Sequence, residues 1–185
     1  MSMTNVLWAG LLAGLLLLLW RAHNRGRVRR AERAWKPASL KTAVLEYAER
    51  TFLTEHPFRL VAKIDRAYRT PSGLLVLTEL KRRPRPRAYR SDIVELSAQR
   101  VAIENSISQR VADVAYVVVE HPLSKMRTPI PVQLLGESEI VALAQRYRDI
   151  SARRTIPIKA ARHALCASCG YKTQCGPKVL AVSKV

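Results

Sequence analysis

The stretch FRLVAKIDRAYRTPSGLLVLTELK, which ends at Lys81, restricts the fold more than any other part of this chain. Its two apolar runs flank the segment TPSG at residues 70–73, a typical tight turn, and together they predict a β-hairpin. Residues two apart on a strand share a face, so Glu79 and Lys81 point to one side and Leu80 to the other. The first strand ends in Asp65. We therefore expect Asp65, Glu79 and Lys81 to gather at one end of a sheet.

These three ionisable side chains allow two interpretations. Two carboxylates supply the hard oxygen ligands that Mg²⁺ or Mn²⁺ prefers, and a bound water becomes acidic enough to attack a phosphodiester. A neighbouring lysine would orient that water and offset charge that develops on the phosphate. The alternative is a cross-strand ion pair at a solvated strand end. Spacing alone leaves both interpretations open.

The residues around the hairpin predict a mixed α/β domain. Before it, Ser39 is a suitable N-cap for a helix that ends near Phe52, and apolar residues recur there at helical spacing. After it, Asp92 and Glu95 suit a capping box for a helix that runs to about Ile107. We expect strands in VADVAYVVVE and PIPVQLL, followed by an amphipathic helix over about 138–153.

The order and separation of several short motifs resemble a known family. Asp65 followed by Glu79-Leu80-Lys81 resembles the D…(D/E)-x-K signature of the PD-(D/E)XK nuclease superfamily. The helix YRSDIVELSAQRVAIE and the terminal CASCGYKTQC are similar to the RecB-like branch that includes the CRISPR-associated exonucleases. The resemblance extends from about Ser39 to Pro177. It implies a restriction-endonuclease-like mixed-sheet core flanked by helices.

The resemblance also implies a role for each residue of the hairpin site. Asp65 and Glu79 would bind a divalent ion, Mg²⁺ or Mn²⁺, and the backbone carbonyl of Leu80 would complete the protein ligands. Lys81 would serve the attacking water.

Two further positions are assigned by the same resemblance. Gln99 matches the glutamine of the Q-x3-Y helix motif, which places substrate near the metal, but Ile103 stands where the tyrosine is expected. Substrate contact from that helix is therefore expected to be altered. Glu46, on the expected first helix, lies where the family often carries an accessory acidic or histidine residue. An ordinary surface glutamate is the alternative.

The loop RRPRPRAYR after Lys81 is strongly basic, as is the whole chain, with 32 Lys+Arg against 14 Asp+Glu and a formal net charge of +18. Such a balance favours a polyanionic partner, either nucleic acid or an anionic membrane surface. The loop arginines would neutralise backbone phosphates, and its tyrosine would stack on an unpaired base. A solvated charged loop is the alternative. The nucleic-acid-binding candidates are Arg82, Arg83, Arg85, Arg87, Tyr89 and Arg90.

The chain has three cysteines, Cys166, Cys169 and Cys175, in a C-x2-C-x5-C arrangement typical of a soft-metal site rather than a disulfide framework. The RecB-like relatives use this spacing with one upstream cysteine to hold a [4Fe-4S] cluster, but no cysteine lies upstream here. His163 would complete an H-x2-C-x2-C-x5-C set for tetrahedral Zn²⁺. Incidental thiols are the remaining interpretation.

The first twenty residues carry no charge and match the length of a membrane-spanning helix, with a buried apolar helix as the alternative. Six arginines follow between residues 21 and 33, and such clusters stay on the cytoplasmic side. The features of a cleaved signal peptide are absent. We expect one transmembrane anchor at 1–20, a basic linker at 21–38, a nuclease domain at 39–178 that includes the cysteine cluster, and a tail at 179–185.

The sequence thus predicts a single-pass membrane protein with its N-terminus outside and its catalytic domain in the cytoplasm. Its expected activity is a metal-dependent (exo)deoxyribonuclease that hydrolyses phosphodiester bonds in DNA. One alternative is a catalytically inactive nucleic-acid-binding module tethered to the membrane. Another is a basic membrane-surface adaptor in which residues 21–33 bind anionic lipid.

Overall fold

The computed structural model describes residues 14–20, 35–157 and 169, which fall into two compact units that divide between Leu135 and Gly136. The first unit contains a five-stranded sheet and one long helix, and the second contains one helix, α3 (Glu137–Ser151). This agrees with the amphipathic helix expected at 138–153. Residues 21–34 of the linker expected at 21–38, and the tail expected at 179–185, lie outside the described residues.

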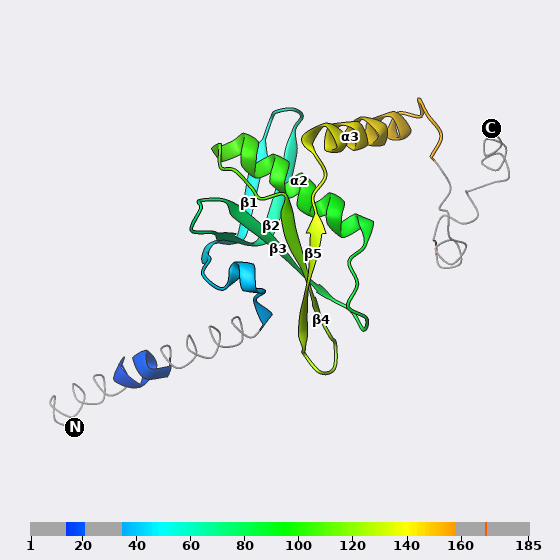
Figure 1. Ribbon diagram of the computed structural model, residues 1–185. Coiled ribbons are helices and arrows are strands. Elements are labelled where there is room, and N and C mark those ends of the chain that lie inside the picture. The colour runs from blue at the N-terminus through cyan, green and yellow to red at the C-terminus, as the bar shows by residue number, and fades with distance from the viewer. Residues whose placement is uncertain (1–13, 21–34, 158–168, 170–185) are drawn as a thin grey trace, which may run out of the picture. The chain divides into compact units, whose positions relative to one another are not determined.

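The sheet runs in the order β1-β2-β3-β4-β5 and is mixed (Figure 1). Neighbouring strands are antiparallel except β3 and β4, which are parallel. A parallel pair needs a crossover connection, and helix α2 (Arg90–Ile107) supplies it. The predicted hairpin, the helix to Ile107 and both later strands are thereby confirmed. The prediction that the first hairpin strand ends in Asp65 is wrong, because this strand continues to Arg69. The strands are β1 (Val44–Thr54), β2 (Leu60–Arg69), β3 (Leu75–Arg82), β4 (Val114–Glu120) and β5 (Arg127–Gln133).

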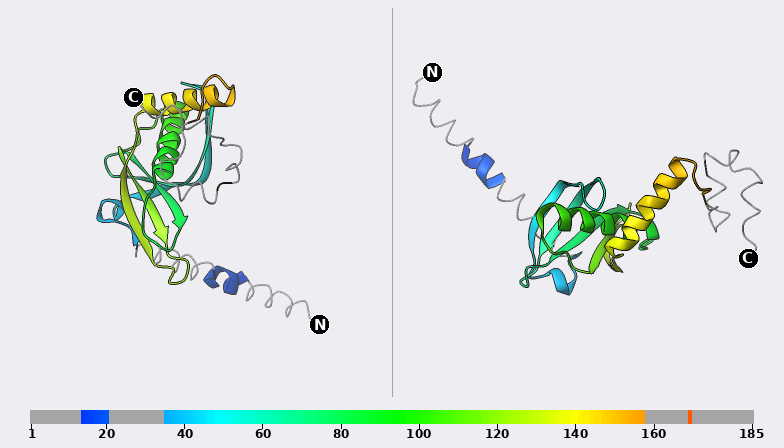
Figure 2. Two further views of the ribbon diagram at one scale, coloured as in Figure 1. Left: turned by 90° about the vertical axis from the view of Figure 1, so that its right-hand side faces the viewer. Right: turned by 90° about the horizontal axis from the view of Figure 1, so that it is seen from above.

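Each face of the sheet carries its own apolar cluster. Helix α2 contacts β1, β2 and β3 on one face, where Leu96 and Ile103 are completely buried (Figure 2). On the other face, Trp35 and Leu40 pack with Tyr68, and the Trp35 and Tyr68 rings meet edge to face at 6.4 Å. Side chains on β3 therefore have two different environments, depending on the parity of their position.

The helix expected from Ser39 to Phe52 is wrong. A short 3-10 turn, η1 (Ala38–Leu40), is followed by the edge strand β1. The pairing of β1 with β2 shifts between Leu45 and Tyr47, so Glu46 is an extra residue in the strand. Such a bulge adds one position to the two-residue period of a strand, and apolar residues then recur at a spacing that resembles a helix.

A second irregularity lies in β2 at the predicted site. Ile64 and Ala67 both face the cluster under α2, whereas Tyr68 faces the opposite cluster. Strict alternation would place Ile64 and Tyr68 on one side, so the alternation shifts by one residue at Asp65-Arg66. The pairing of β2 with β3 also ends here, at Arg66 opposite Thr78. The two strands part beyond that pair.

The capping box of α2 lies three residues before the expected one, with Tyr89 as N-cap and Asp92 at N3. The backbone N–H of Tyr89 donates to Asp92 at 2.8 Å, which closes the first turn. Glu95 has a different partner, described below, so its expected capping role is wrong. Residues 14–20 are helical, and among the residues that the structure describes no helix is both long and apolar enough to cross a membrane. Most of the anchor expected at 1–20 lies outside the described residues.

Candidate active site

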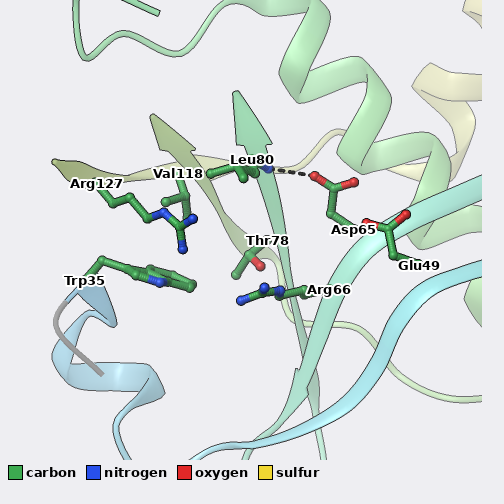
Figure 3. Close-up of a pocket in the computed structure, with 8 residues that line it drawn as sticks. All are labelled: Trp35, Glu49, Asp65, Arg66, Thr78, Leu80, Val118 and Arg127. Carbon is green, nitrogen blue, oxygen red and sulfur yellow. Dashed lines mark hydrogen bonds between the residues drawn. The ribbon is translucent and has the colours of Figure 1, made fainter. Parts of the chain in front are cut away.

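Asp65 lies where β2 and β3 separate. Its Oδ2 accepts a hydrogen bond of 2.8 Å from the backbone N–H of Leu80, in place of a regular bond of the ladder (Figure 3). The carboxylate is therefore held beside the Glu79-Leu80-Lys81 triplet, as the motif predicted.

Glu79 lies on the α2 side of β3 and is almost completely buried. Its Oε1 accepts from Lys81 Nζ at 2.8 Å, and its Oε2 accepts from the Gln99 amide at 3.1 Å. Burial raises the pKa of Glu79, and the nearby carboxylates of Asp65 and Glu95 act in the same direction. The hydrogen bonds from Lys81 and Gln99 oppose that rise without cancelling it. The negative charge of Glu79 is thus not fully compensated by the residues around it.

Lys81 connects two carboxylates. Its Nζ lies 2.8 Å from Glu79 Oε1 and 2.8 Å from Glu95 Oε2. Burial works to lower the pKa of Lys81, but the two hydrogen bonds outweigh it, so the pKa lies above its ordinary value. Lys81 is accordingly an ammonium group fixed in position. Sequence reasoning missed Glu95 as its partner, although Glu95 precedes Gln99 by four residues and so shares its helix face.

Gln99 joins α2 to both β2 and β3. Its Nε2 donates to the backbone carbonyl of Lys63 and to Glu79 Oε2, each at 3.1 Å. Both partners are acceptors, which determines that the nitrogen end of the amide faces them. The other end, Gln99 Oε1, is buried, and no residue that the structure describes donates to it. A buried acceptor without a partner costs free energy.

The two other residues that the family resemblance singled out, Ile103 and Glu46, have their side-chain partners outside this site. Ile103, one turn beyond Gln99, is completely buried in the apolar cluster, so it faces the core rather than a substrate. Glu46 lies on β1, not on a helix, and both of its oxygens pair with Arg69, at 3.1 and 2.9 Å. The prediction that placed Glu46 on a helix is therefore wrong. The ion pair with Arg69 is consistent with the alternative of a surface glutamate.

The donor set fits a divalent cation of the Mg²⁺ or Mn²⁺ type. Carboxylate oxygens are the ligands such ions prefer, and Asp65 and Glu79 supply them at the gap between the strands. The carboxylates of Asp65, Glu79 and Glu95 outnumber the single ammonium of Lys81, so an added positive charge would relieve their repulsion. Within residues 14–20, 35–157 and 169, no three acidic, histidine or cysteine side chains form a cluster that could hold a metal alone. Water would have to complete the coordination sphere.

The model of the PD-(D/E)XK nuclease superfamily matches residues 6–176. The chain belongs to this superfamily. Its members are usually metal-dependent nucleases, and the five-stranded mixed sheet with a crossover helix agrees with their α/β fold. Among curated proteins, none matches this chain. The crystal structure of SSO0001 is similar over 92% of this chain and 71% of its own, with 14% identity and a TM-score of 0.47, which is too distant to support any statement about function.

Membership in the superfamily confirms the recognition made from the sequence, while the RecB-like branch stays a prediction. The same holds for the cysteine cluster, because Cys166, Cys175 and His163 lie outside the described residues. Cys169 is described as an exposed free thiol. Its participation in a [4Fe-4S] or Zn²⁺ centre is not tested by this observation.

The basic loop of the nuclease fold is anchored by one of its own arginines. Arg83 donates twice to Asp92, at 2.7 Å each, and its guanidinium also lies 4.6 Å from the centre of the Tyr89 ring. Arg87 approaches the same ring at 5.5 Å. Arg83 thus has a structural partner, whereas Arg82, Arg85, Arg87, Tyr89 and Arg90 are exposed. Contact of any of these with nucleic acid stays a prediction.

Proposed function

We propose that this chain is a metal-dependent nuclease that hydrolyses phosphodiester bonds in DNA. The observation that carries the proposal is the convergence of Asp65, Glu79, Lys81 and Gln99 at the gap between β2 and β3. An ordinary strand-end ion pair would be satisfied by its own partners. Here burial and neighbouring carboxylates raise the pKa of Glu79, and Gln99 keeps an unpaired buried oxygen, so the arrangement is incomplete without a ligand.

The contacts of the four site residues support a different role for each of them. Asp65 and Glu79 would hold Mg²⁺ or Mn²⁺, with the backbone carbonyl of Leu80 as a further ligand. Such an ion, when bound, supplies an acidified water and a positive charge for the phosphate. Lys81 is held as an ammonium by two carboxylates, so it would orient a nucleophile and offset negative charge on the phosphate instead of accepting a proton. Gln99 holds the Glu79 side chain in position.

Two finer proposals rest on the sequence. The uncharged residues 1–20 and the following arginines would anchor the protein in a membrane with the nuclease domain in the cytoplasm. Release of the full-length chain by an alkaline wash of membranes would overturn this. Cys166, Cys169 and Cys175 would hold a [4Fe-4S] cluster, or Zn²⁺ with His163. Elemental analysis that finds neither iron nor zinc in anaerobically purified protein would exclude both centres.

The activity is tested with the full-length protein purified in detergent. Single-stranded DNA, double-stranded DNA and RNA are each incubated with Mg²⁺, Mn²⁺, Ca²⁺ or EDTA. We expect cleavage of at least one DNA substrate with Mg²⁺ or Mn²⁺ and none in EDTA, and we expect Asp65→Asn to abolish it while the protein stays folded. Arg59→Gln, which removes an exposed arginine of the β1–β2 turn, serves as the control and should cleave like the wild type.

A folded wild-type protein that binds DNA in a salt-dependent manner but cleaves no substrate would contradict the nuclease proposal. It would favour the inactive tethering module instead. Cleavage of RNA alone would retain the reaction and correct the substrate.

A further inference from the structure

A small pocket of about 70 Å³ opens on the face of the sheet opposite α2. It is lined by Trp35, which precedes η1, and by residues of all five strands, and Figure 3 shows these side chains. Two of them, Asp65 and Leu80, also belong to the gap that holds the proposed active site. The pocket and the site are therefore two openings of one region where β2 and β3 separate.

One end of this pocket is lined by hydrogen-bond donors. The guanidinium groups of Arg66 and Arg127 both extend toward the indole of Trp35 (Figure 3). Arg127 is oriented by Glu120, whose carboxylate accepts from its Nε at 2.9 Å. Arginine carries donors and no acceptor, and its planar fork suits the oxygens of a phosphate or carboxylate. The donors at this end of the pocket therefore suit an anion.

The indole of Trp35 supplies an independent observation. Trp35 is only 6% exposed, and its ring packs against Tyr68. Its Nε1 is buried, and no residue that the structure describes accepts a hydrogen bond from it. A buried donor without an acceptor is rare because it forfeits the hydrogen bond that it makes with water in the unfolded chain. An anion in the pocket would supply the missing acceptor.

The opposite end of the pocket has the reverse chemistry. Glu49 and Asp65 line it, and both are carboxylates. Lys63 neutralises Glu49 at 2.6 Å, while Asp65 has the backbone N–H of Leu80. The charge therefore changes from cationic at Trp35 to anionic at Asp65. A nucleic-acid strand that presents one phosphodiester to the metal site would meet the cationic end with a neighbouring phosphate.

We propose that the pocket formed by Trp35, Arg66 and Arg127 binds a phosphate of the nucleic-acid strand, next to the phosphodiester held at Asp65. This inference rests on the proposed nuclease function and specifies how the substrate is held. Two guanidinium groups and an indole N–H recognise the phosphate oxygens, so the pocket reads the backbone and not the base. A phosphate at a strand end and one within the strand share this chemistry.

The test measures binding without chemistry. The full-length protein in detergent and EDTA is titrated with labelled single-stranded oligonucleotides that carry a 5′-phosphate, a 3′-phosphate or neither. Arg127→Gln should weaken binding by about tenfold, the size of one charge-assisted hydrogen bond. Arg59→Gln controls for the loss of one positive charge.

The outcomes separate the two sources of phosphate. If the pocket holds an end, the phosphorylated oligonucleotide binds more tightly to the wild type and Arg127→Gln removes that preference. If it holds an internal phosphate, Arg127→Gln weakens all three oligonucleotides alike. Trp35→Phe, which keeps a ring in the apolar cluster but removes the N–H, should weaken binding in the same pattern, with thermal unfolding as the check on its fold.

Equal affinities of wild type, Arg127→Gln and Trp35→Phe would overturn the pocket proposal, whatever the nuclease assay shows. The nuclease proposal fails separately, when the wild type binds but does not cleave. Absence of any binding by the folded wild type would overturn the pocket proposal, whereas the nuclease proposal is decided by the cleavage assay with added metal.

Discussion

Two ion-pair clusters connect the end of β3 to α2, one at Lys81 within the strand and one at Arg83 just beyond it, and they differ in how completely their charged groups are paired. In the first, Lys81 is shared by Glu79 and Glu95. In the second, Arg83 forms a bidentate pair with the buried carboxylate of Asp92, with both distances 2.7 Å. Asp92 also accepts the N–H of Tyr89, so the second cluster has little unmet hydrogen-bonding capacity.

The pKa shifts of the two carboxylates express this difference. Burial works to raise the pKa of Asp92, but the hydrogen bonds from Arg83 and Tyr89 outweigh it, and the pKa lies below its ordinary value. For Glu79 burial prevails and the pKa is raised. A buried group whose charge is fully compensated stabilises the fold, and one whose charge is not compensated indicates a site that needs a further partner. The comparison indicates that the Arg83–Asp92 pair stabilises the fold and that the Glu79–Lys81 pair belongs to a functional site.

The largest expected effect is on cleavage by Glu79→Gln. Loss of one carboxylate ligand should lower the cleavage rate by about 10²- to 10³-fold or more, as removal of a central electrostatic group does in other enzymes. The melting temperature should stay the same or rise, because the neutral amide removes repulsion with Asp65 and Glu95 and Lys81 keeps Glu95. Rate assays and thermal unfolding measure the two quantities. A large loss of stability would show that Glu79 has a structural role, and the two ion-pair clusters would then not differ in function.

Asp92→Ala should have the opposite profile. It leaves the half-buried Arg83 without its partner and removes the cap of α2, so the free energy of unfolding should fall by about 3 kcal/mol. Cleavage per folded molecule should be largely retained at low temperature. The control is Asp149→Ala in the exposed pair with Arg154, where we expect a change of less than about 1 kcal/mol. Urea titrations provide the comparison.

The stabilising effect of Asp92 should depend on pH. Because its pKa is lower in the folded protein than in the unfolded chain, the stabilisation is complete above the ordinary value of 3.8 and is lost as the pH falls through the folded value. The difference in unfolding free energy between wild type and Asp92→Asn should therefore be constant from neutral pH to about pH 5 and shrink below that. A difference that grows on acidification would contradict the assigned pair. Urea titration across this range is the measurement.

The smallest effect is expected for Glu95→Gln. Lys81 would lose one acceptor and keep Glu79, so its position becomes less restricted while its charge stays. We expect cleavage to fall by roughly tenfold and stability to change by less than about 1 kcal/mol, since Glu95 is partly exposed. Steady-state cleavage at saturating DNA is the readout. No change in rate would mean that Glu79 alone positions Lys81.

Much of the fold and of the site could be predicted from the sequence, because both depend on short-range patterns. The TPSG turn and the alternation around Glu79 determined the β2–β3 hairpin and placed Glu79 and Lys81 on one face. The order of the motifs was enough to recognise the superfamily, which the match over residues 6–176 confirms. The failure at β1 has a local cause as well: one extra residue, Glu46, changes the spacing that distinguishes a strand from a helix.

Only the tertiary structure decided which long side chains pair and which are left without partners. The sequence contains many arginines and several glutamates that could pair, and nothing in its spacing selects Asp92 for Arg83 or Glu95 for Lys81. That choice depends on how α2 lies across the sheet. The burial of Trp35 beside Arg66 and Arg127 likewise joins the segment before η1 to β2 and β5, which are far apart in the chain. Local sequence sets which groups are present, and packing sets which of them lose water without gaining a partner.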